Sequence, residues 1–110
     1  MILQKNIQPD ALIRVRFLTH EEGGRKTPVV VEWTQGQQTG YGCPMRINGE
    51  LHDFRTLISG NTTYMPGKTY DLNIKFLYSE LVLPKLHKGL EIELWEGKTI
   101  AKGFVERVME

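Results

Sequence analysis

Apolar and polar residues alternate along several short stretches of the chain, as they do in half-buried β-strands. The alternation is clear in residues 11–18, 70–78 and 90–95, and the β-branched run 29–33 predicts a further strand. If alternation sets the inward face, one core is predicted from these residues: Ile13, Val15, Phe17, Leu72, Ile74, Phe76, Leu90, Ile92 and Leu94.

Turn signals separate these stretches. Asn48-Gly49 predicts a tight hairpin between two apolar segments. Gly97-Lys98 predicts a turn into a last strand, 100–108, whereas the glycine-containing segment 34–42 is typical of a flexible loop. Residues 81–87 are the one place where a helical turn is expected. Short strands joined by turns predict an all-β sandwich or a closed barrel, and the pattern does not choose between them.

Composition narrows the class of protein. A chain of 110 residues suits one domain, and a formal net charge of +1 gives no overall field for nucleic acid, so RNA contact would need a local patch. Cys43 is the single cysteine, which excludes an intrachain disulfide. We expect its thiol to be buried and inert, as free cysteines commonly are. No apolar run has the length of a signal sequence or a membrane span, so we expect a cytoplasmic protein without a membrane partner.

The residues that could carry chemistry are dispersed. His20, His52 and His87 have no spacing that suits a metal site. The Gly-Lys-Thr tripeptides at 67–69 and 97–99 lack the earlier glycine of a phosphate-binding loop and lead into strand patterns instead of helices. We therefore expect no metal, no cofactor, no nucleotide and no enzymatic activity.

One local basic cluster stands out in the first quarter of the chain. Arg14 and Arg16 share a strand face, and Arg25 and Lys26 follow in the next loop. A solvated strand face whose charges deter edge pairing is favoured over nucleic-acid contact, given the neutral total. Trp95 has the opposite parity to the apolar residues of its strand, which predicts an outward aromatic suited to an interface.

Several motifs occur together in an order that resembles the third, C-terminal domain of elongation factor Tu. They are Glu22-Gly23-Gly24-Arg25 with Thr27-Pro28, Met65-Pro66-Gly67 before the long alternating strand, Gly89-Leu90 with Glu96-Gly97, and Gly103 in the terminal strand. The resemblance implies a single six-stranded antiparallel closed barrel over residues 11–110, preceded by an N-terminal extension at 1–10. It implies this domain alone, without the GTPase domain.

In that family the domain performs no chemistry; it packs on the GTPase domain, contacts the T-stem of aminoacyl-tRNA and receives the nucleotide exchange factor. The resemblance assigns the T-stem contact to Glu96 and Gly97. The segment 29–35 departs from the family, because it lacks the Arg-Pro-Gln run that the family has there.

We therefore expect a non-catalytic binding module for a protein partner linked to translation or to a toxin that recognises the factor. The alternative is a translation accessory that binds a tRNA stem. The expected site for partner or RNA is this set: Gly23, Gly24, Arg25, Lys26, Trp95, Glu96 and Gly97.

Overall fold

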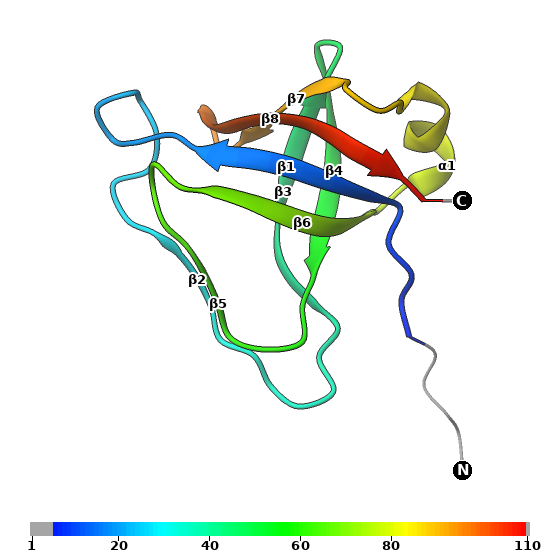
Figure 1. Cartoon of the computed structure of the whole chain (residues 1–110), viewed down its shortest axis with the longest axis horizontal. Coiled ribbons are helices and arrows are strands. Elements are labelled where there is room, and N and C mark those ends of the chain that lie inside the picture. Colours follow the sequence, from blue (N-terminus) through cyan, green and yellow to red (C-terminus); the bar gives the residue numbers. More distant parts are fainter. Residues whose placement is uncertain (1–5, 110) are drawn as a thin grey trace.

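Six antiparallel strands close into a barrel in the computed structural model, which describes residues 6–109 (Figure 1). The strand order around the barrel is β1-β6-β4-β3-β7-β8, and β2 and β5 form a separate two-stranded ribbon. The elements are β1 Ala11–Phe17, β2 Val29–Val31, β3 Thr39–Ile47, β4 Glu50–Leu57, β5 Thr62–Tyr64, β6 Thr69–Phe76, α1 Ser79–Val82, a 3₁₀ turn at Leu83–Lys85, β7 Glu91–Trp95 and β8 Thr99–Val108. The predicted closed six-stranded barrel is confirmed.

The inward faces predicted from alternation meet in one core. All nine predicted core residues are buried, and Met45, Ile47 and Phe54 of β3 and β4 join them. Asn48 and Gly49 have φ of 50° and 83°, so both central residues of the β3–β4 turn adopt the positive φ that a two-residue hairpin requires.

Three boundaries differ from the sequence-based expectation. Strand β3 begins at Thr39, so residues 39–42 belong to a strand and not to the predicted loop 34–42. The glycines that suggested flexibility instead allow close packing, because a Cβ on Gly42 would lie 2.3 Å from the Arg55 guanidinium. Strand β6 ends at Phe76, and the predicted helical turn lies at 79–85.

The β2–β5 ribbon was not expected, since the three residues of β5 are too short for a pattern to reveal. Tyr64 of β5 attaches the ribbon to the barrel: its ring stacks on Phe17 at 5.5 Å and meets Tyr70 edge-on at 5.1 Å. An aromatic cluster therefore lies where β1 ends and the loop toward β2 begins.

Strand β1 begins at Ala11. Of the N-terminal extension expected at 1–10, residues 1–5 lie outside the described residues. Asp10 is buried, and its backbone N–H donates to the Ile74 carbonyl at 2.7 Å. The extension thus joins the barrel one residue before the strand.

Candidate interaction site

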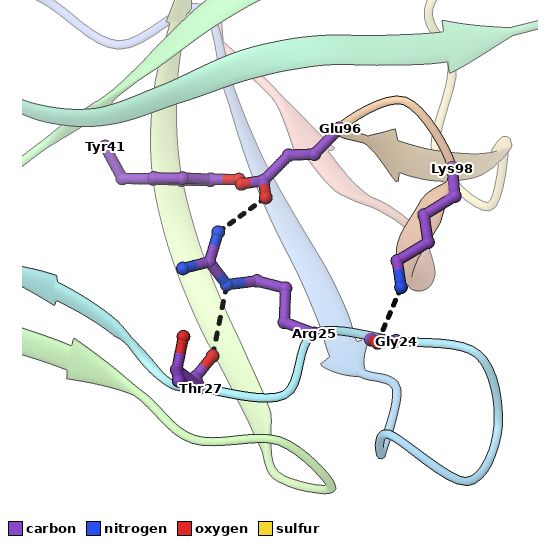
Figure 2. A network of polar contacts seen from close by, with 6 residues as sticks. All are labelled: Gly24, Arg25, Thr27, Tyr41, Glu96 and Lys98. Atoms are coloured by element: carbon purple, nitrogen blue, oxygen red, sulfur yellow. Dashed lines mark hydrogen bonds and ion pairs between the residues drawn. The ribbon is translucent and has the colours of Figure 1, made fainter.

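The loop after β1 and the turn between β7 and β8 lie against each other, although more than 70 residues separate them in the chain (Figure 2). The Arg25 guanidinium forms an ion pair with Glu96, with 2.5 Å between Nη1 and Oε1. Arg25 Nε also donates to the Thr27 carbonyl at 3.1 Å, which fixes the guanidinium in its own loop. We call residues 19–27 together with 95–98 the loop–turn surface.

The loop half of this surface is ordered by its own hydrogen bonds. The Thr19 backbone N–H donates to the Glu22 carboxylate at 2.9 Å, while the Glu22 N–H donates to the Thr19 hydroxyl at 3.2 Å. This reciprocal pair is the capping-box arrangement. Gly24 is buried here, and a Cβ at its position would lie 2.3 Å from the Leu18 carbonyl oxygen, so the close approach requires glycine.

The turn half is connected to the loop by a second contact. Lys98 Nζ donates to the Gly24 carbonyl at 3.0 Å, and the Glu96 N–H donates to the Lys98 carbonyl at 2.8 Å. Gly97 between them is exposed and has φ of 74°, while Gly23 on the loop is exposed and has φ of 95°. The surface therefore presents two backbone segments that no side chain covers at those glycines.

Tyr41 of β3 completes the cluster, since its hydroxyl donates to the other oxygen of the Glu96 carboxylate. Burial, chiefly, raises the pKa of the Tyr41 phenol well above its ordinary value, with Cys43 and Glu96 adding to the shift. The same ring meets Tyr64 edge-on at 6.3 Å, so Tyr41 belongs to both the aromatic cluster and the polar cluster. Glu96 is thus held by a phenol from within the barrel and a guanidinium from the loop.

Sequence reasoning assigned Tyr41 to a loop and treated Lys98 only as part of a turn. A signal for Tyr41 was present: Tyr41, Cys43, Met45 and Ile47 alternate in step, which continues the inward face of the hairpin strand. The glycines at 40 and 42 concealed that alternation. Nothing in the local sequence identifies the partner of Lys98, because the contact depends on the register of the closed barrel.

The predicted basic cluster is largely neutralised by carboxylates. Arg14 pairs with Asp71 at 2.7 Å, and Arg16 pairs with Glu22 at 2.9 Å. Hydrogen bonding and charge from Arg14 hold the pKa of Asp71 below its usual range, and the bond from Arg16 lowers that of Glu22 to about 2. Lys26 is exposed and forms no ion pair within residues 6–109. The four cations are therefore not a continuous positive surface.

Trp95 is the last residue of β7 and is half-buried, so it is neither a core residue nor the fully outward aromatic that its parity suggested. The structure brings the predicted site residues together as one surface, but their roles differ. Gly24, Arg25 and Glu96 hold the surface together, whereas Gly23, Lys26 and Gly97 are exposed on it.

The single cysteine lies inside the barrel, whereas His20 is exposed on the loop–turn surface. Burial raises the pKa of the Cys43 thiol to about 11, in agreement with a buried residue. Within residues 6–109, no cluster of three or more His, Cys, Asp or Glu side chains could hold a metal ion. No helix in that range is long and apolar enough to cross a membrane.

Comparison with protein-family models found no match to this chain, and comparison with curated proteins found none either. The Arg25 guanidinium and the Glu96 carboxylate satisfy each other, and Tyr41 donates to the same carboxylate. The glycine backbone at Gly23 and Gly97 is exposed beside the exposed Lys26.

Proposed function

We propose that this protein is a non-catalytic β-barrel binding module related to the third domain of elongation factor Tu. Its loop–turn surface would contact a protein partner linked to translation or to a toxin that recognises the factor. The observation that carries the proposal is the clasp of Arg25, Glu96 and Tyr41, which fixes two distant backbone turns as one preformed surface. A preformed surface lowers the conformational entropy lost on binding.

The charge distribution favours a protein over a nucleic acid as the partner. RNA binding depends on cations that neutralise phosphates, and such binding weakens steeply with salt. Arg25 and Arg16 on or beside the loop–turn surface are already paired with carboxylates. Exposed glycine backbone at Gly23 and Gly97 can instead approach the main chain of a protein closely.

Site-specific photo-crosslinking tests this proposal. A photoreactive amino acid would replace Lys26 on the loop–turn surface in one variant and Arg107, exposed near the opposite end of β1, in a control. We expect a translation component, or a toxin that binds the factor, to crosslink from position 26 and not from position 107. Capture of tRNA at position 26 would favour the RNA-binding alternative. Equal products at both positions would contradict the proposed surface.

A further inference from the structure

Three large apolar side chains project from the corner where β6 turns into α1. Leu77, Tyr78 and Leu81 are 61%, 64% and 65% exposed, and they lie within five consecutive residues. We call them the apolar corner. Figure 1 places α1 at the opposite end of the barrel from the loop after β1. Grouped large apolar side chains on a surface typically mark a site of interaction.

The corner is held in place by a buried carboxylate. Asp10 Oδ2 accepts from the Phe76 N–H at 2.8 Å and from the Ser79 hydroxyl at 2.6 Å. Lys75 Nζ lies 3.1 Å from the other oxygen of Asp10. Val82, 1% exposed, anchors α1 in the core. The apolar side chains are therefore displayed by a firmly bonded turn and are not exposed by fraying.

The charges around the corner indicate what could cover it. Asp53 lies beside Leu77 across the β4–β6 pair, because the Leu77 N–H donates to the Asp53 carbonyl at 3.0 Å. Glu80 lies between Tyr78 and Leu81 in the chain. Both carboxylates belong to exposed residues, and neither forms an ion pair within residues 6–109.

The lysines of β6 and of the 3₁₀ turn are paired with carboxylates. Lys75 is bound to Asp10, and Lys85 is bound to Glu50 with 2.6 Å between Nζ and Oε2. Arg55 lies opposite Lys75 and has no carboxylate partner within residues 6–109, but its guanidinium lies over Gly42 of β3, where it donates to the Phe54 carbonyl at 2.9 Å. The unpaired carboxylates of Asp53 and Glu80 thus lie next to the apolar side chains, and the unpaired cation of Arg55 is directed toward β3.

We propose that the apolar corner is a second docking site, which binds an amphipathic segment of a partner protein whose apolar residues are flanked by lysine or arginine. Leu77, Tyr78 and Leu81 would receive the apolar side chains, and Asp53 and Glu80 would face the cations. A second copy of this chain fits less well, because two-fold pairing through the corner would bring the same carboxylates together. The site goes beyond the proposed function, since it lies away from the loop–turn surface.

A designed helical peptide with leucines on one face and lysines beside them is the probe. Its control carries glutamates in place of the lysines. We expect the fluorescence-labelled lysine peptide to bind the full chain with an affinity that falls as salt rises, and the glutamate peptide to bind at least about tenfold more weakly.

Variants locate the binding. Replacing both Leu77 and Leu81 with serine should weaken the lysine peptide at least about tenfold. Asp53→Asn with Glu80→Gln should weaken it severalfold and flatten its salt dependence. Val30→Ser removes an equally exposed apolar residue on β2 and should change nothing. Circular dichroism would establish that each variant is folded.

Equal binding of the lysine peptide to the wild type and to the Leu77 and Leu81 double variant would overturn the proposal. Equal binding of the two peptides would overturn it as well. Sedimentation that shows a dimer dependent on these leucines would assign the corner to a second copy instead. All these variants leave Arg25 and Glu96 intact, so this site and the proposed function can fail separately.

Discussion

Replacing Glu96 with alanine should lower the unfolding free energy of the barrel by more than the loss of a typical exposed ion pair would. The carboxylate receives both the Arg25 guanidinium and the Tyr41 hydroxyl, and the Arg25 and Glu96 side chains are 29% and 26% exposed. Unit charges about 4 Å apart attract by ~4 kcal/mol at an effective dielectric constant of ~20, before desolvation is subtracted. Hydrogen bonds to charged groups typically retain ~1.5–3 kcal/mol. We expect Glu96→Ala to cost about 2–4 kcal/mol of unfolding free energy.

A double-mutant cycle separates the pair from its surroundings. Arg25→Ala should cost about 1–2 kcal/mol, because Glu96 keeps its bond from Tyr41, and the coupling energy of the cycle should be about 1–2 kcal/mol. Urea denaturation followed by circular dichroism measures all four proteins. The matched control is Arg46 with Glu93, a pair 3.6 Å apart and more exposed, whose coupling should be about 0–0.5 kcal/mol. Additive losses at Arg25 and Glu96, within about 0.3 kcal/mol, would refute the clasp.

Two further predictions concern the barrel itself. Gly103→Ala should lower the unfolding free energy by at least about 2 kcal/mol in urea denaturation, because its Cβ would lie 1.8 Å from the Arg14 carbonyl oxygen on the neighbouring strand. The control Gly60→Ala has open space around it and should change the unfolding free energy by no more than about 0.5 kcal/mol. Similar losses in the two variants would contradict the packing of β1 on β8. Cys43 should resist iodoacetamide in the folded protein and react after unfolding. Alkylation of the native protein at pH 8 would contradict the burial of the thiol. Because folding keeps this thiol protonated, its contribution to the unfolding free energy should be complete below its ordinary pKa of 9.0 and decline as pH rises toward about 11.

Alternation in the sequence predicted the core because a strand places successive side chains on opposite faces. Ile13, Val15 and Phe17 needed no other information to be placed inside, and Asn48-Gly49 was enough to place the hairpin. Closure of six strands into a barrel could not be predicted from alternation. It depends on which strand lies beside which, and β1 pairs with β6 and β8, neither of which is its neighbour in sequence.

In the candidate site, too, the sequence predicted local features but not the contacts between distant segments. Local sequence indicated that Gly23, Gly97 and Arg25 lie at turns, but it could not show that Arg25 forms an ion pair with Glu96. That pairing arises because the ends of β1 and β7 meet at one end of the closed barrel. Arg14 and Arg16 looked like a basic face for a similar reason, since their carboxylate partners Asp71 and Glu22 are supplied by β6 and by the folded loop.

The central claim is that the loop–turn surface binds the partner, and charge reversal on that surface tests it most directly. Lys26 is exposed and lies outside the clasp, so Lys26→Glu should leave the fold intact. The test is the dissociation constant of the partner crosslinked from position 26, measured by calorimetry for wild type, Lys26→Glu and the control Arg107→Glu. The account predicts a loss of about tenfold or more for Lys26→Glu, equivalent to ~1.4 kcal/mol, and none for the control. Equal dissociation constants for all three proteins would contradict it.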